Sequence, residues 1–156
     1  MNPKSIKNSA LGGLAGGLLF GLMMGAMGTL PMIGKMVGLP NAAAGFVVHM
    51  IISASIGIGF GIVFGRVKLS IGNGLLAGAT YGALWWLLGP LTLMPLFMGM
   101  GFGVNWTSAA VAAMFPSLIG HLMFGFVLGS TFSLLQRRSD STGIVHKEGA
   151  TPIPSR

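Results

Sequence analysis

The spacing of the charged residues restricts the fold of this chain more than any other feature. Residues 69–136 contain no Asp, Glu, Lys or Arg, and neither do residues 8–34 and 37–65. A membrane-spanning helix needs about 20 mainly apolar residues, so the two shorter stretches hold one span each and the long stretch holds two. Only 7% of the residues are charged, against about 25% in a typical soluble domain. A water-compatible surface is therefore excluded.

We predict an all-α membrane protein with four transmembrane helices in a domain of residues 1–138. A polar segment follows, and its composition predicts a disordered cytoplasmic tail at residues 139–156. The four predicted spans lie near residues 10–30, 42–65, 74–94 and 109–136.

The basic residues predict the orientation of these spans. With four spans, eight of the nine basic residues fall on one side of the membrane and Lys35 alone falls on the other. The positive-inside rule then predicts a multi-pass protein of the plasma (inner) membrane with both termini cytoplasmic. The net charge of +7 is explained by this orientation and by anionic lipid headgroups, and not by nucleic acid. A cleaved signal peptide ending near Gly28 is the competing interpretation of the first apolar stretch.

The sequence contains the pattern of an internal duplication. Gly13, Gly17 and Gly21 recur 61 residues later as Gly74, Gly78 and Gly82, and His49 recurs 72 residues later as His121. Gly57, Phe60 and Arg66 recur at the same 72-residue offset. Each half would be a helical hairpin, and the two hairpins would enter the membrane in the same sense. We therefore predict two parallel repeats, unlike the inverted repeats of many transporters.

Small residues recur at every fourth position of all four predicted spans. Because lipid supplies no hydrophobic drive for helices to associate, packing depends on close backbone approach, which such ridges permit. We predict glycine packing ridges that close a tight bundle and leave surface for self-association, with a glycine-lined pore as the alternative. The predicted packing residues are Gly13, Gly17, Gly21, Gly57, Gly61, Gly78, Gly82, Gly125 and Gly129.

Two intramembrane histidines, His49 and His121, are the candidate polar site, together with Ser53 and Ser117 on the same ridges. Each histidine precedes a basic residue by 17 positions, about 25 Å of helix, so both lie at one depth. An ionisable residue inside a membrane is a functional-site hypothesis by default. Three uses compete: a neutral hydrogen bond that pins the second and fourth spans, ligation of metal or haem by two imidazoles, and a pH-sensitive gate or polar pathway.

Methionines make the metal hypothesis more specific. Met94, Met98 and Met100 lie beside the predicted extracytoplasmic connection. Thioether sulfur selects Cu(I) and imidazole suits copper as well. A copper site formed by these methionines with His49 and His121 is one interpretation. The other is that methionine fills gaps in apolar packing, in which case no cofactor is bound.

Catalytic patterns are absent from the sequence. The predicted spans contain no Asp or Glu and the chain has no cysteine, which excludes paired-carboxylate catalysis, thiolate metal sites and a cysteine nucleophile. We predict a non-enzymatic inner-membrane subunit or a small binding or transport protein embedded in the lipid bilayer. It would form a homo-oligomer or belong to a membrane complex. The alternative is a copper- or haem-binding membrane protein.

Three short segments carry a resemblance to known proteins: Tyr81–Trp86, Leu91–Pro95 and Gly120–Leu122. With them the chain resembles uncharacterised small four-helix membrane proteins of prokaryotes. This resemblance implies a four-helix membrane fold and no particular activity, so it assigns no site residue.

Overall fold

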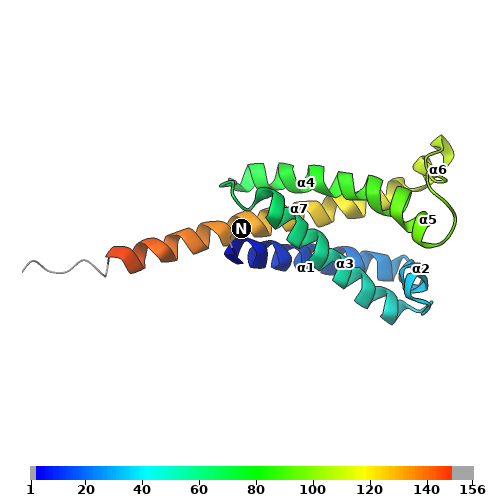
Figure 1. Ribbon diagram of the computed structural model, residues 1–156, viewed down its shortest axis with the longest axis horizontal. Coiled ribbons are helices and arrows are strands. Elements are labelled where there is room, and N and C mark those ends of the chain that lie inside the picture. The colour runs from blue at the N-terminus through cyan, green and yellow to red at the C-terminus, as the bar shows by residue number, and fades with distance from the viewer. Residues whose placement is uncertain (1–2, 149–156) are drawn as a thin grey trace, which may run out of the picture.

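The computed structural model describes the backbone of residues 3–148 and the side chains of residues 3–139. Every regular element in this part of the chain is a helix, which confirms the predicted helical class. Four long helices (α1, α3, α4 and α7) are joined by short helices and turns (Figure 1). The elements are α1 (Pro3–Ala26), α2 (Leu30–Gly34), the 3-10 helix η1 (Lys35–Val37), α3 (Ala42–Phe64), α4 (Ile71–Leu88), the π-helix η2 (Gly89–Leu93), α5 (Met94–Phe97), α6 (Ser108–Ala113) and α7 (Phe115–Glu148).

Polar caps and glycine turns set the helix boundaries. The side chain of Asn41 accepts a hydrogen bond from the Ala44 backbone N–H at 2.9 Å and begins α3. Ser70 caps α4 and Thr107 caps α6 in the same way. These side chains satisfy backbone N–H groups that the first turn of a helix leaves unpaired. Gly28 has φ of 68° just after α1, a left-handed conformation that ends the helix because it suits glycine and few other residues.

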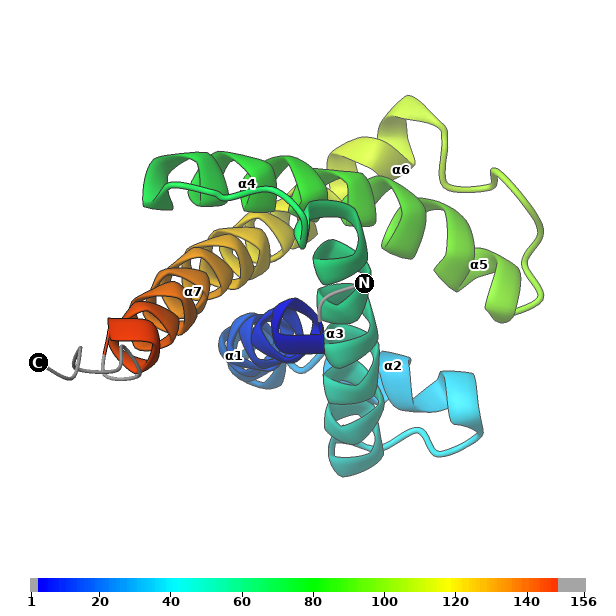
Figure 2. The same cartoon turned by 60° about the vertical axis from the view of Figure 1, so that its left-hand side comes forward.

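α1 is one of the two inner helices among the four long helices. It packs against α3 on one side and against α7 on the other, and α4 packs along α7. The four helices thus form a curled row in the order α3, α1, α7, α4. Figure 2 views α1 nearly end-on, between α7 and α3. This arrangement differs from the predicted bundle, in which all four ridges close on one another. The two outer helices, α3 and α4, approach each other mainly through side chains.

Glycines bring the backbones together where the helices pack most closely. A Cβ added at Gly13 of α1 would lie 2.9 Å from the Gly57 Cα of α3. Between α4 and α7, a Cβ at Gly78 would meet the Gly125 carbonyl oxygen and lie 3.1 Å from the Gly129 Cα. Both pairs of helices therefore touch through main-chain atoms. A side chain at these positions would prevent such a close approach.

Aromatic side chains fill the space where α3 diverges from α4 and α7. Phe60 is fully buried, and its ring meets those of Tyr81 and Phe132 edge-on with centroids 5.3 and 5.5 Å apart. The Tyr81 hydroxyl donates a hydrogen bond to the Ile56 carbonyl oxygen of α3 at 3.1 Å. Phe124 and Leu128 of α7 extend the same core. Small residues thus pack the close interfaces, and large rings fill the wide one.

The prediction of four membrane spans is wrong. Within the described residues, three helices are long and apolar enough to cross a membrane, at Pro3–Ala26, Ala42–Phe64 and Phe115–Ser139. The predicted span at 74–94 does not form one helix, since α4 ends at Leu88 and a π-helix with Pro90 follows. The 18 residues of α4 measure about 27 Å, less than the hydrocarbon core of about 30 Å. Asn73, Thr80 and Tyr81 also reduce its apolar character.

The last helix extends beyond the predicted transmembrane domain. α7 continues to Glu148, so helix covers the first part of the segment in which a disordered tail is predicted. Residues 149–156 lie outside the described residues.

Candidate functional site

His49 joins α3 to α1. Its side chain is 7% exposed, and its Nε2 atom lies 2.9 Å from the Gly17 carbonyl oxygen of α1. A carbonyl only accepts, so Nε2 carries the proton and donates. The approach is possible because Gly17 and Gly21 have no side chain: a Cβ at Gly21 would lie 3.1 Å from the imidazole Cδ2. His49 is therefore a buried donor that ties two helices together.

His121 has the opposite arrangement. Its Nδ1 atom lies 2.8 Å from the Ser117 carbonyl oxygen one turn earlier in α7, so Nδ1 donates and the bond stays within its own helix. In the neutral imidazole, Nε2 is then the acceptor nitrogen. Among the residues whose side chains are described, none forms a hydrogen bond with this Nε2 atom. A Cβ added at Gly89 would lie 3.8 Å from it, so Nε2 is directed toward the junction of α4 and the π-helix.

Phe20 of α1 connects the two histidines. Its ring meets the His49 ring edge-on at a centroid distance of 5.4 Å and the His121 ring at 4.9 Å. A Cβ at Gly120 would collide with the Phe20 ring, so this glycine of α7 makes room for it. The structure therefore brings both predicted histidines to one cluster, which we call the Phe20 cluster (Phe20, His49 and His121). No hydrogen bond between the two histidines occurs in it.

Each of the two predicted serines lies one helical turn from the histidine of its own helix. Ser53 is 2% exposed, and its hydroxyl lies 3.5 Å from His49 Nε2. The Ser117 hydroxyl lies 3.4 Å from His121 Nδ1. Both distances are at the limit of a hydrogen bond, whereas the carbonyl contacts of the same nitrogens are short. The backbone thus orients both rings, and the serine hydroxyls add little.

An irregular helical segment that begins at Gly89 lies beside His121 of the Phe20 cluster. Gly89–Leu93 is a π-helix, a form often found at functional sites. Two side chains hold this segment in place: Asn105 donates to the Pro90 carbonyl oxygen at 3.2 Å, and the Trp106 indole N–H donates to the Thr92 hydroxyl at 3.2 Å. These bonds satisfy polar groups that the helix break exposes.

The methionines of the predicted copper site lie on the segment after the π-helix. Met94 begins α5, whereas Met98 is 37% exposed and Met100 is 58% exposed. Within the described residues, no group of three or more His, Asp or Glu side chains could hold a metal ion. A site made of these methionines and both histidines remains a prediction.

Three residues that pack in this part of the molecule were not predicted from the sequence: Gly12, Gly16 and Phe20. Gly12 and Gly16 pack against α7, where a Cβ would lie 2.8 Å from the Leu128 carbonyl oxygen and 2.6 Å from that of Phe124. The signal was present, because the doublets Gly12–Gly13 and Gly16–Gly17 give α1 two small faces and so make it a central helix. Phe20 carries no such signal, since one phenylalanine among many apolar residues does not stand out.

Comparison with known proteins found no relative of this chain. No known protein family, no curated protein and no solved structure matches the chain.

Proposed function

We propose that the protein is a non-enzymatic, multi-pass protein of the inner membrane that serves as a membrane subunit and associates with further membrane protein chains. The observation that carries this proposal is the filled interior. The Phe20 ring occupies the space beside both histidines, and glycines close the main interfaces through backbone contact. Such packing favours a rigid structural element over a solute pathway.

The exposed surface supports the same proposal. Apolar side chains of α1 and α3 cover the outside of the row, as expected for helices that face lipid or other membrane helices. The chain's two hairpins also use matched contacts: Gly21 packs against His49 as Gly82 packs against the His121 backbone. This correspondence supports the internal duplication that the sequence predicts.

Native mass spectrometry of the full chain, released from vesicles of its own membrane, tests the proposal. We expect complexes of fixed stoichiometry that contain more than one chain. The proposal fails if the chain is released only as a monomer and, when reconstituted alone in proteoliposomes, conducts protons or small solutes faster than empty vesicles.

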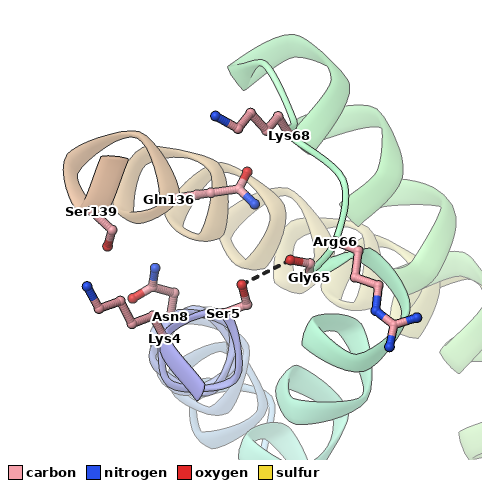
Figure 3. Close-up of a pocket in the computed structure, with 8 residues that line it drawn as sticks. All are labelled: Lys4, Ser5, Asn8, Gly65, Arg66, Lys68, Gln136 and Ser139. Atoms are coloured by element: carbon pink, nitrogen blue, oxygen red, sulfur yellow. Dashed lines mark hydrogen bonds between the residues drawn. The ribbon is translucent and has the colours of Figure 1, made fainter. Parts of the chain in front are cut away.

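We propose that the basic end of the molecule faces the cytoplasm. Lys4, Arg66 and Lys68 line one cavity at this end (Figure 3). Lys35 directly follows α2, which lies at the opposite end of α1 (Figure 1). The start of α1 and the stretch of α7 from Gln136 to Ser139 also lie at the basic end, since residues of both line this cavity. The positive-inside rule assigns such an end to the cytoplasmic side.

Single cysteines test this orientation, because the chain contains none of its own. In intact cells, we expect a membrane-impermeant maleimide to label Gly38→Cys and to leave Ser139→Cys unlabelled. Labelling of both variants after the membrane is permeabilised is the control. The opposite pattern in intact cells would contradict the orientation.

A ligand-binding function is the second candidate, and His121 is the observation that favours it. An imidazole that donates Nδ1–H to a backbone carbonyl and leaves Nε2 as acceptor has the arrangement of many metal-ligating histidines. Copper analysis and absorbance spectra of the protein purified in mild detergent distinguish this candidate. Bound copper or a haem absorbance band that disappears in His121→Ala would support it, and their absence from the wild-type protein would contradict it.

A further inference from the structure

Residues 98–107 join α5 to α6 and expose a row of large apolar side chains. We call this segment the α5–α6 loop. Phe102 is 66% exposed and Trp106 is 57% exposed. Large apolar residues alternate along the loop with three glycines and an asparagine. The large residues are Met98, Met100, Phe102, Val104 and Trp106, and the residues between them are Gly99, Gly101, Gly103 and Asn105.

The glycines give this loop a defined backbone conformation. Gly99, Gly101 and Gly103 have φ of 73°, 103° and 76°. Residues with a side chain rarely adopt these values, whereas glycine does so at little cost. Three such residues at alternate positions prevent both a helix and a regular strand. The residues between the glycines therefore supply the side chains of the loop, and these side chains are apolar and exposed.

Hydrogen bonds hold the loop in place on the segment before it. The Met100 backbone N–H donates to the Pro95 carbonyl oxygen of α5 at 2.9 Å, in addition to the bonds of Asn105 and Trp106 to the π-helix. The Phe102 ring meets the Trp106 ring edge-on at a centroid distance of 4.9 Å. Because the indole N–H already donates to Thr92, an apolar environment around Trp106 would leave no indole donor unpaired.

The position of the loop in the molecule indicates what covers its apolar side. The loop lies at the end where α2 lies, opposite the basic end (Figure 1), and it projects away from the packed long helices (Figure 2). α4 is too short to cross the hydrocarbon core, and the π-helix and α5 continue the chain from α4 to the loop. Residues 69–136 contain no Asp, Glu, Lys or Arg, so no charged side chain of the loop has to reach water.

We propose that the α5–α6 loop inserts Met100, Phe102 and Trp106 into the interfacial layer of the lipid bilayer, on the side opposite the basic end. Aromatic rings are enriched at this depth. Irregular backbone is not tolerated next to lipid in the hydrocarbon core, so the loop lies at the interface and goes no deeper. Lipid is favoured over a protein partner because the loop protrudes and carries no charge with which to select one. The inference rests on the proposal that the protein spans the membrane.

Spin labels on single cysteines test the insertion in the full chain, reconstituted at low density in vesicles of phosphatidylcholine and phosphatidylglycerol. Phe102→Cys is the test position. Ile51→Cys, on the exposed side of α3, is the hydrocarbon reference, and Lys35→Cys, at the same end as the loop, is the water reference. Electron paramagnetic resonance measures how often each label collides with oxygen, which concentrates in the bilayer, and with a water-soluble nickel chelate.

We expect the label at residue 102 to collide more with oxygen than with the chelate, as at residue 51, and the label at residue 35 to show the reverse. Chelate collisions at residue 102 that match those at residue 35, with residue 51 in lipid, overturn the inference alone. Few collisions with either reagent at residue 102 show that protein covers the loop and overturn it as well. Chelate access at residue 51 contradicts the proposed membrane location itself. Unchanged circular dichroism verifies the fold of each variant.

Discussion

Gly78→Ala is expected to reduce the free energy of unfolding by about 3 kcal/mol, the upper end of the usual cost of overpacking. The added Cβ would collide with the Gly125 carbonyl oxygen and lie 3.1 Å from the Gly129 Cα. Both neighbours are main-chain atoms, so no side chain can rotate away. Relief requires α4 and α7 to separate, and this separation also disturbs the contacts next to Gly78.

Unfolding in mixed micelles with increasing SDS, followed by circular dichroism and by tryptophan fluorescence, measures this effect. Gly72→Ala is the matched control, because Gly72 lies in the same helix and an added Cβ would meet nothing within 4 Å. The control should be neutral or stabilised by up to about 1 kcal/mol, since alanine favours helix. Equal stability of the two variants would show that α4 and α7 do not pack through glycine.

His49→Ala is expected to reduce the free energy of unfolding by about 2–3 kcal/mol. The change removes the hydrogen bond to the Gly17 carbonyl oxygen, the edge contact with Phe20 and the volume of a buried ring. The Gly17 carbonyl keeps its bond from the Gly21 N–H within α1, so the loss of the histidine bond costs about 0.5–1.5 kcal/mol. The cavity left by the buried ring adds to this cost. The same SDS titration measures the loss.

His121→Ala is the informative comparison. Its strongest hydrogen bond goes to Ser117 in the same helix, so the loss should be smaller than for His49→Ala. His49→Gln should recover part of the stability, because the glutamine amide reaches farther than alanine and can donate to Gly17. A result in which His121→Ala is the more harmful change would contradict the assignment of His49 as the link between α1 and α3.

The sequence predicts the boundaries of α3 well and those of α4 poorly. Asn41 is a strong helix start, and the apolar run from Ala42 to Phe64 has no interruption. Beyond Leu88 the residues remain apolar, so composition alone extends the third span to residue 94. Pro90 lacks a backbone N–H and the local bonds of Thr92 and Asn105 favour the π-helix, and hydropathy registers neither effect.

For the glycines, too, the sequence predicts one part of the structure and the packing decides the other. Their spacing of four predicts a small-residue face on each helix, since positions four apart lie on one side. The spacing does not identify the helix that meets this face. Contact of Gly13 with α3, of Gly16 with α7 and of Gly78 with α7 depends on the order of the helices in the row.

The scarcity and spacing of charge by themselves indicated helices apolar enough for a membrane. Uninterrupted apolar stretches of about 20 residues suit a spanning helix, which satisfies its own backbone in lipid. The sequence also marked two histidines as equivalent. Only the tertiary structure distinguished them: His49 meets the Gly17 carbonyl of another helix, and His121 meets a carbonyl of its own. Sequence spacing specifies the face on which a side chain lies, whereas the atom it meets depends on how the helices pack, and this difference makes one histidine a link and leaves the other with an open nitrogen.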